Sequence, residues 1–179
     1  MPGPSSSYTT VIDYLSCKIN NYRITSPVSR RPTSDSVLDP REAWHRLLQA
    51  SSRVLRELDH ALDQRDRITV TEFDVLITLD NASAHQLRMT DVARATMLSS
   101  GGMTRLVGRL EDQGLVRRDP DPGDARASRA TLTPAGERKL ARARTTHDAV
   151  LARMISPRLT AADLRALERI LGKLIKRDT

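Results

Sequence analysis

Hydrophobic residues recur at the spacing of α-helices along most of the chain after residue 38. The longest pattern begins at Asp39, whose side chain is suited to cap a helix, and at Pro40, which fits the first helical turn. The apolar stripe then covers about six turns and comprises Trp44, Leu47, Leu48, Val54, Leu55, Leu58 and Leu62, with Ser51 among them. The pattern predicts a helix over residues 39–66, which is longer than a small domain needs for its own core.

The next segment predicts a shorter helix and a brief strand. Thr69 and Glu72 have the spacing of a capping box, in which each side chain bonds the backbone amide of the other residue. An apolar run follows, made of Phe73, Leu76, Ile77 and Leu79. Residues 87–89 are predicted to form a strand that pairs with a later hairpin.

Two more helices are predicted in the C-terminal part of the chain. Thr133 and Pro134 mark the start of a long helix that continues to about Ile155 and ends before a proline. Thr160 and Asp163 then have the spacing of a capping pair. Four leucines follow at the spacing of a coiled-coil seam: Leu164, Leu167, Leu171 and Leu174. Because two heptads are too short to hold a coiled coil alone, this seam is predicted to pack with the two long helices in a dimer interface.

Residues 89–136 carry the most informative pattern, which is two short amphipathic helices, a glycine stop and an arginine-bearing hairpin. Thr90 is a suitable N-cap for the first helix, with Asp91 in its first turn. A turn is predicted at residues 98–99. The second helix is predicted over residues 100–113, with a buried stripe of Met103, Leu106, Val107 and Leu110. Gly114 ends this helix, and the order of elements is typical of a winged helix-turn-helix.

The hairpin is predicted from two short strands, residues 115–119 and 128–132, around the turn-rich sequence PDPGDARA. Four arginines project from it: Arg117, Arg118, Arg126 and Arg129. An arginine at a loop tip is suited to a narrow, electronegative minor groove, and strand arginines are suited to phosphates. Asp124 lies two residues before Arg126 and is predicted to hold that guanidinium. The alternative interpretation of the loop alone is a solvated turn.

The side of the second helix opposite its buried stripe is small, hydroxylated and cationic. It comprises Ser100, Gly101, Thr104, Arg105, Gly108 and Arg109. Small residues let a helix backbone approach base edges, arginine bonds guanine through two hydrogen bonds, and the threonine methyl meets a thymine methyl. Taken alone, the helix is equally compatible with a solvated face. Two helices and a hairpin in this order favour a nucleic-acid interface.

The stretch LRMTDVARATMLSSGGMTRLVGRLEDQGLVRRDPDPGDARASRATLTPAG resembles the DNA-binding domain of the multiple-antibiotic-resistance regulator (MarR) family, and a looser similarity extends over residues 39–176. The resemblance implies a mostly α fold with a small β-hairpin wing (α+β), in which a winged helix-turn-helix is joined to long N- and C-terminal dimerisation helices. It also implies that the helix beginning at Ser99 enters the major groove. Arg126 of the Asp124-Ala125-Arg126 motif would enter the minor groove.

The resemblance divides the chain into a DNA-binding domain, residues 67–136, and a helical dimerisation region, residues 39–66 and 137–179. It implies a sequence-specific transcriptional regulator, a homodimeric repressor of a pseudo-palindromic operator in double-stranded DNA. Release of the DNA by a small aromatic or carboxylate effector is implied as well. The alternative is a winged-helix protein-interaction module. An exposed apolar patch over residues 100–109 would favour that alternative, and the sequence shows none.

The residues that would contact an effector have two interpretations. His147 lies on the apolar stripe of the helix after the hairpin, so it is either a ligand contact or a histidine of the core or dimer interface. Weaker candidates on the first long helix, whose alternative is a solvated face, are His45, Arg46 and Arg53. Cys17 lies too far before that helix to match the peroxide-sensing cysteine of one branch of the family.

Composition narrows the classes of protein further. A net charge of +7 favours polyanionic partners, and a single cysteine excludes an internal disulfide. No apolar run reaches the roughly 18 residues of a membrane span and no signal peptide is recognisable, so a cytoplasmic location without a membrane partner is expected. Residues 1–38, rich in Ser, Thr and Pro, are predicted to be a flexible extension, or in part a short helix around residues 11–24.

The sequence gives no support to an enzymatic function. The HExxH, P-loop, Rossmann glycine and GxSxG motifs are absent. The histidines are scattered without the spacing of a zinc site: His45, His60, His85 and His147. We therefore expect no catalytic residues, no metal site and no cofactor.

Overall fold

The computed structural model describes residues 39–96 and 99–175. The predicted N-terminal extension with Cys17 lies outside the described residues, as does part of the predicted turn before the second motif helix. The α-helices are α2 (Pro40–Asp66), α3 (Val70–Asp80), α4 (Met89–Ala95), α5 (Ser100–Asp112), α6 (Pro134–Ile155) and α7 (Ala161–Ile175). The remaining elements are a short 3-10 helix, η1 (Ser83–His85), and the strands β1 (Gln86–Arg88), β2 (Val116–Asp121) and β3 (Asp124–Leu132).

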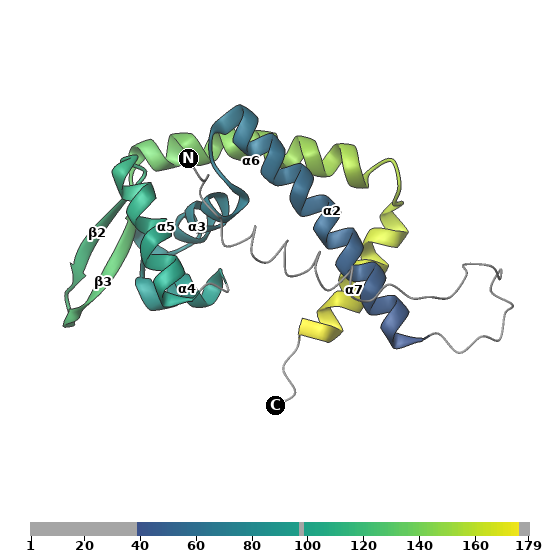
Figure 1. Ribbon diagram of the computed structural model, residues 1–179, viewed down its shortest axis with the longest axis horizontal. Coiled ribbons are helices and arrows are strands. Elements are labelled where there is room, and N and C mark those ends of the chain that lie inside the picture. The colour runs from purple at the N-terminus through teal and green to yellow at the C-terminus, as the bar shows by residue number, and fades with distance from the viewer. Residues whose placement is uncertain (1–38, 97–98, 176–179) are drawn as a thin grey trace, which may run out of the picture.

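The structure has two parts, a head formed by α3, α4, α5 and the three strands, and a long arm formed by α2, α6 and α7. Figure 1 shows α3, α4, α5 and the strands at one end of the structure and α7 at the other, with α6 running between them. α6 packs against both α2 and α3. The predicted mostly helical fold with a small wing is therefore confirmed. Of the helices in residues 39–96 and 99–175, none combines the length and the apolarity that a membrane span requires.

The three strands form one antiparallel sheet in the order β1-β3-β2. Leu87 of β1 and Arg118 of β2 both lie opposite Ala130 of β3. The brief strand predicted before the helix-turn-helix is confirmed, and it begins and ends one residue earlier than expected. Backbone hydrogen bonds along β3 therefore fasten the wing to the strand that leads into α4.

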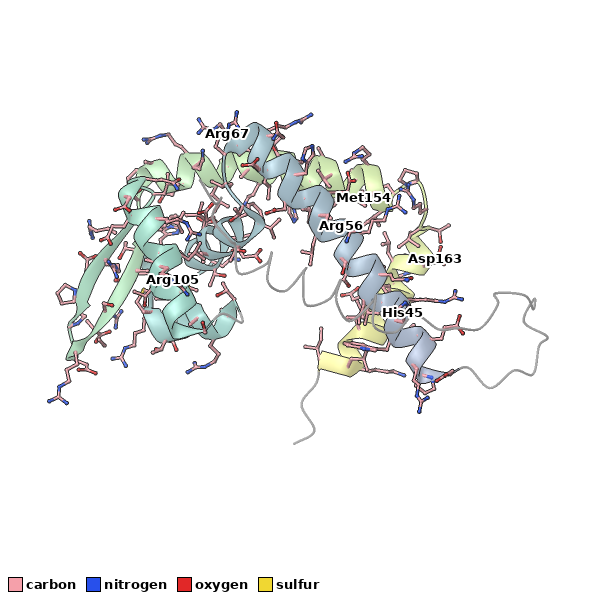
Figure 2. The ribbon with its side chains drawn as sticks, in the orientation of Figure 1. His45, Arg56, Arg67, Arg105, Met154 and Asp163 are labelled. Atoms are coloured by element: carbon pink, nitrogen blue, oxygen red, sulfur yellow. The ribbon has the colours of Figure 1, made fainter. Side chains whose placement is uncertain are left out.

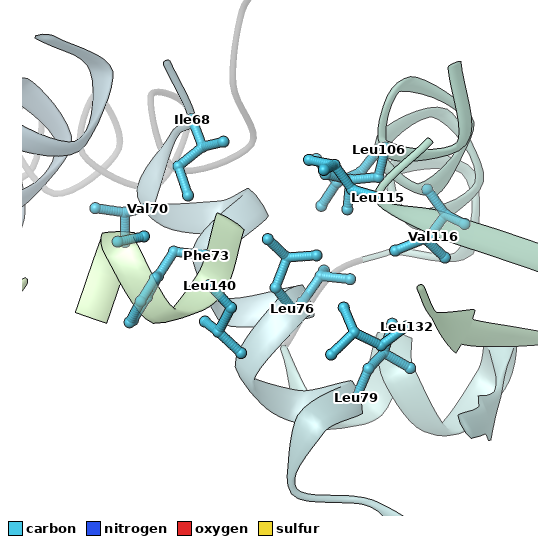
Figure 3. Packing of buried hydrophobic residues seen from close by; sticks show 14 of the residues in the cluster. Ile68, Val70, Phe73, Leu76, Leu79, Leu106, Leu115, Val116, Leu132 and Leu140 are labelled. Atoms are coloured by element: carbon cyan, nitrogen blue, oxygen red, sulfur yellow. The ribbon is translucent and has the colours of Figure 1, made fainter. Parts of the chain in front are cut away.

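One hydrophobic core joins the head to α2 and α6 (Figure 3). The predicted stripe of α5 is buried in it. Around that stripe the cluster includes Ile68, Val70, Phe73, Leu76, Leu79, Leu115, Val116, Leu132 and Leu140. Because α5 buries this side among residues of α3, the sheet and α6, its opposite side faces outward.

The predicted caps of the long helices are confirmed. Asp39 accepts a first-turn amide of α2 at 2.9 Å. Thr69 and Glu72 form the reciprocal capping box of α3, with hydrogen bonds of 3.2 and 2.9 Å. Thr133 accepts a first-turn amide of α6 at 3.1 Å, and Thr160 accepts one at the start of α7 at 3.2 Å.

The cap predicted for α4 is wrong. α4 begins at Met89, so Thr90 lies inside the first turn, and Arg88 occupies the cap position without a side-chain hydrogen bond. Pairing of β1 with β3 fixes the backbone as far as Arg88. The helix starts directly where that pairing ends.

The hairpin turn is shorter than the predicted loop. Only Pro122 and Gly123 separate β2 from β3. Asp121 and Asp124 still lie opposite each other in the sheet, although the register shifts between Pro120 and Asp121. The remainder of the PDPGDARA sequence therefore belongs to the strands.

Gly136 lies where the start of α6 meets the base of the wing. A Cβ at this position would collide with the Leu115 carbonyl oxygen and would lie 2.6 Å from Cδ1 of Leu132. The Leu115 carbonyl is backbone and cannot move aside by changing a rotamer. We expect Gly136→Ala to lower the free energy of unfolding by about 1–3 kcal/mol, as overpacking does.

Gly108→Ala is the matched control, because no atom lies within 4 Å of a Cβ added at that position of α5. It is expected to raise the free energy of unfolding by about 0.5–1 kcal/mol, the gain in helix propensity. Urea denaturation at one fixed protein concentration measures both variants. Wild-type stability in Gly136→Ala would contradict the close approach of α6 and the wing.

Candidate nucleic-acid interface

Capping interactions hold α5 at both ends. Ser99 is the N-cap and accepts a first-turn amide at 3.2 Å. At the other end Gly114 has a φ of +69°. The amides of Gly114 and Leu115 bond the carbonyls of Glu111 and Leu110 at 2.8 and 2.9 Å. This is the Schellman arrangement, so the predicted glycine stop is confirmed and the chain passes directly into β2.

The outward face of α5 carries the small and cationic residues that the sequence predicts. Ser100 is its first residue, and Gly101, Thr104 and Arg105 are exposed. No atom would lie within 4 Å of a Cβ at Gly101. Figure 2 shows Arg105 at the wing-bearing end of the structure. Within residues 39–96 and 99–175 its guanidinium forms no ion pair, so this face combines an open backbone with a free cation.

Arg109 lies in a different environment from the predicted one. The sequence places it on the outward face of α5, whereas its Nε donates to Oε1 of Glu72 in α3 at 3.3 Å. Glu72 is buried, and its other oxygen accepts the Thr69 amide that begins α3. A buried carboxylate requires a partner, which draws the guanidinium inward. Arg109 therefore ties the last turn of α5 to the first turn of α3, and a DNA contact of Arg109 stays a prediction.

Three arginines of the wing are held by nearby carboxylates. The pairs, with the distance from Nε to the carboxylate oxygen, are Arg117–Asp119 (2.9 Å), Arg118–Glu111 (2.8 Å) and Arg129–Asp121 (2.6 Å). In the described part of the chain, every side-chain hydrogen bond from these arginines uses Nε. Their terminal nitrogens keep their donors for another acceptor.

Arg126 is an exposed residue of β3 and not a residue of the loop tip, because the turn is only two residues long. Oδ1 of Asp124 accepts the backbone amide of Arg126 at 3.0 Å. The predicted contact of Asp124 with the guanidinium is therefore replaced by one with the backbone. Among the described residues no carboxylate pairs with the Arg126 guanidinium. Arg105 and Arg126 are thus the two unpaired arginines among those singled out on α5 and the wing.

Sequence reasoning missed Arg88 and Asp121. The Asp121 side chain is fully buried and pairs with both Arg88 and Arg129. The hydrogen bond from Arg88 contributes most to a lowered pKa of Asp121, followed by the bond from Arg129 and then the bond from the Gly123 amide. Together they hold the pKa of Asp121 well below its usual range. Its carboxylate is therefore charged at neutral pH. Arg88 and Asp121 are 33 residues apart, and no local pattern connects them.

Comparison with known proteins shows which family the chain resembles. Residues 68–127 match the model of the MarR family. Over 89 residues the chain is 34% identical to the HTH-type transcriptional regulator PecS of Dickeya dadantii, covering 48% of this chain and 54% of PecS. Over 131 residues it is 28% identical to the multiple antibiotic resistance protein MarR of Escherichia coli, covering 73% of this chain and 87% of that protein. The chain resembles the MarR family, most closely over residues 68–127.

Likeness to a solved MarR-family structure extends over most of the fold. Sco3205, a MarR family transcriptional regulator from Streptomyces coelicolor, was solved in complex with DNA. It matches with a TM-score of 0.71 and 25% identity, covering 83% of this chain and 91% of Sco3205. By contrast, the chain spans about half the length of PecS. The family resemblance seen in the sequence is thus confirmed.

The residues predicted to contact an effector do not gather in one place. His147 of α6 stacks on Phe73 of α3, with ring centroids 4.8 Å apart and an interplanar angle of 17°. Its Nδ1 lies 3.1 Å from a carboxylate oxygen of Asp148. The other candidates lie on α2: His45, Arg46 and Arg53. Figure 2 shows His45 near α7, at the opposite end of the structure from Arg105.

A cleft of about 240 Å³ lies between the end of α2, the start of α3 and the end of α5. Arg67, Glu72 and Arg109 are among its lining residues, and none of the effector candidates is. In the part of the chain that the structure describes, no group of three or more His, Cys, Asp or Glu residues is arranged to hold a metal ion.

Because Arg109 contacts Glu72 and Arg105 does not, alanine substitutions of these two arginines of α5 should have different effects on the free energy of unfolding. Arg109→Ala leaves buried Glu72 without its guanidinium, and we expect the free energy of unfolding to fall by about 1 kcal/mol. Arg105→Ala is the control, since Arg105 is exposed and unpaired, and its effect should stay within about 0.5 kcal/mol. Thermal and urea unfolding measure both. Equal effects would show that the Glu72 contact does not stabilise the fold.

Proposed function

We propose that this protein is a transcriptional regulator that binds double-stranded DNA in a sequence-specific manner and has no catalytic activity. The proposal depends on one observation, which is that Arg105 on α5 and Arg126 on β3 lack the carboxylate partners that hold the neighbouring arginines. Both are exposed, and neither forms an ion pair among the described residues. The complex of its relative Sco3205 with DNA supports the same assignment. DNA binding would reside in residues 67–136.

In this proposal α5 enters the major groove with its outward face. Gly101 leaves the backbone open at the start of the helix, where a helix comes nearest to base edges. Ser100 and Thr104 supply hydroxyls and Arg105 supplies the paired donors that match guanine. The face of α5 carries no large exposed apolar side chain, which a protein-interaction surface would require.

The wing contributes the second contact. Arg126 of β3 would lie in the minor groove, where a narrow groove concentrates negative potential and attracts a guanidinium. The bond from the Asp124 carboxylate to the Arg126 amide fixes the backbone from which that side chain extends. Arg117, Arg118 and Arg129 would contact phosphates through terminal nitrogens while Nε keeps its carboxylate partner. Such contacts position the protein without selecting a sequence.

We also propose that the protein acts as a homodimer through residues 39–66 and 137–179. In residues 39–96 and 99–175, no side chain of α7 is buried. Large apolar side chains exposed on α2 and α7 are Trp44 (59%), Leu164 (42%), Leu167 (41%), Ile170 (49%), Leu174 (70%) and Ile175 (78%). A second copy that covers this surface would remove it from water. Two heads related by a two-fold axis would bind a pseudo-palindromic operator and act as a repressor.

We also propose that a small effector releases the protein from DNA. The stacked pair of His147 and Phe73 joins α6 to α3, between the dimer helices and the head. An aromatic or carboxylate ligand at His147 would act on this junction. His45, Arg46 and Arg53 would require a site formed with the second copy, because His45 and Arg46 lie toward the exposed start of α2 and Arg53 is exposed at its middle.

DNA recognition is tested by fluorescence anisotropy with a duplex that the wild-type protein selects from a random library and a scrambled duplex of the same composition. Arg105→Ala should lose about 1–3 kcal/mol of discrimination between the two, the range for a lost base contact. Arg126→Ala should also weaken binding to the selected duplex. Arg56→Ala, which removes an exposed charge from α2, should affect both duplexes equally.

A salt series gives the outcome that would overturn DNA recognition. If the wild-type protein binds the two duplexes equally, and both affinities fall together as salt rises, the contacts are to phosphate only. The function as a sequence-specific regulator would then be wrong.

The dimer is tested on α7. Leu167→Glu combined with Leu174→Glu places two charges on the apolar seam, and we expect the dimer to dissociate to monomers because burying unpaired charges is unfavourable. Arg169→Glu is the control, since this exposed residue lies on the other side of the helix. Analytical ultracentrifugation measures the mass of each variant. A double variant that keeps the mass of a dimer would exclude the α7 seam as the interface.

A further inference from the structure

Asp121 is the acceptor at the centre of a small network on the wing. Its Oδ2 accepts from Nε of Arg88 at 2.9 Å and from Nε of Arg129 at 2.6 Å. Its Oδ1 accepts from Nη2 of Arg88 at 3.1 Å and from the Gly123 amide at 2.9 Å. The Asp121 side chain is fully buried under these donors. One carboxylate thus joins β1, β3 and the hairpin turn.

The network lies at an irregularity of the hairpin. The register between β2 and β3 shifts between Pro120 and Asp121, and Pro120 has no amide proton to give to the ladder. A two-stranded ribbon bends and twists most easily at such an irregularity. The bidentate bond from Arg88 crosses this point from outside the hairpin, because Arg88 belongs to β1.

We propose that Arg88 and Asp121 are positioning residues that hold the wing at a fixed angle to the helix-turn-helix, so that Arg126 reaches the DNA in register with α5. The proposal rests on the DNA-binding function proposed above. Arg88 immediately precedes Met89, the first residue of α4, so its side chain connects the wing to the helices. Arg126 lies five residues beyond Asp121 on the same hairpin. Bending at Pro120 would therefore move the Arg126 guanidinium relative to Arg105.

The two arginine partners of Asp121 have separable roles. Arg129 lies on β3, within the hairpin, so its bond to Asp121 closes the hairpin on itself. Arg88 extends the side-chain network to β1, next to α4, in addition to the backbone pairing of β1 with β3. Arg88→Ala thus removes the side-chain link to β1 while Asp121 keeps Arg129 and the Gly123 amide. This variant separates the position of the wing from the integrity of the hairpin.

The test is a double-mutant cycle that combines Arg88→Ala with Arg126→Ala, read as affinity for the selected duplex. If Arg88 acts by placing Arg126, Arg88→Ala should weaken binding roughly five- to tenfold in the wild-type background, the order of a lost groove contact. In the Arg126→Ala background it should weaken binding less than about twofold, since residues that act as one unit are not additive. Equal losses in both backgrounds would overturn the proposal and make Arg88 an independent phosphate contact.

Arg94→Ala is the charge-matched control for this cycle. Arg94 is an exposed residue of α4 that pairs with Asp91 of its own helix at 2.9 Å, and its loss removes the same charge from the same region. Its effect should be equal in the two backgrounds. A loss for Arg94→Ala that also disappears with Arg126→Ala would mean that charge and not position explains the coupling.

Asp121→Asn supplies a test with the opposite change in charge. Removing a negative charge raises the attraction of the wing for any DNA, so affinity for the scrambled duplex should stay equal or rise. Preference for the selected duplex should nevertheless fall about fivefold, as for a displaced groove contact. An unchanged preference would overturn the role of Asp121.

Amide hydrogen exchange, measured in the protein without DNA, tests the positioning role of Arg88 independently of the proposed DNA binding. Arg88→Ala should speed the exchange of amides in β1 and β3 and leave α3 and α6 unchanged, because the link lost is local. Arg94→Ala should change neither set. If the wild-type protein shows no preference for the selected duplex, the proposed function fails. If β1 and β3 exchange at wild-type rates in Arg88→Ala, the positioning role fails whatever the DNA result.

Discussion

The burial of one side of α5 is the constraint on which the rest of the structure depends. Met103, Val107 and Leu110 lie in the same core as residues of α3, the sheet and α6. A helix with one side in that core has only one side to offer to a partner. The Schellman turn at Gly114 then directs the chain into β2 at once, so the outward face of α5 and the wing emerge from the same part of the head.

An arginine of the head is paired where a carboxylate lies beside it and unpaired where none does. The pairs of α5 and the wing use a hydrogen bond from Nε, and where the acceptor is buried, as for Glu72 and Asp121, the guanidinium compensates a buried negative charge. Arg105 and Arg126 have no such neighbour among the described residues. The head therefore uses most of its arginines for its own shape and leaves two unpaired among the described residues. A count of arginines alone would give every one of them the same role.

Local signals in the sequence predicted the architecture well, whereas contacts between distant residues could not be predicted. The caps at Asp39 and Thr69 and the stop at Gly114 depend on neighbours within a few residues, and all three are as expected. The inward turn of Arg109 depends on Glu72, 37 residues earlier. The start of α4 was misplaced for the same reason, because strand pairing overrides the preference of Thr90 for a cap.

α6 connects the proposed dimer surface to the head. At its start Thr133 donates to the Gly114 carbonyl at 2.7 Å, at the base of the wing. Farther along, Arg144 pairs with Asp80 of α3 at 2.7 Å and Arg153 pairs with a glutamate of α2 at 2.9 Å. A 22-residue helix is about 33 Å long, so a tilt of about 10° at its α7 end displaces the other end by about 6 Å, given that rise per residue. A shift of that size exceeds the reach of a hydrogen bond. In the proposed dimer, the angle at which two copies pack through α7 would determine whether both heads meet their half-sites, and a ligand beside His147, midway along α6, would act through the same helix.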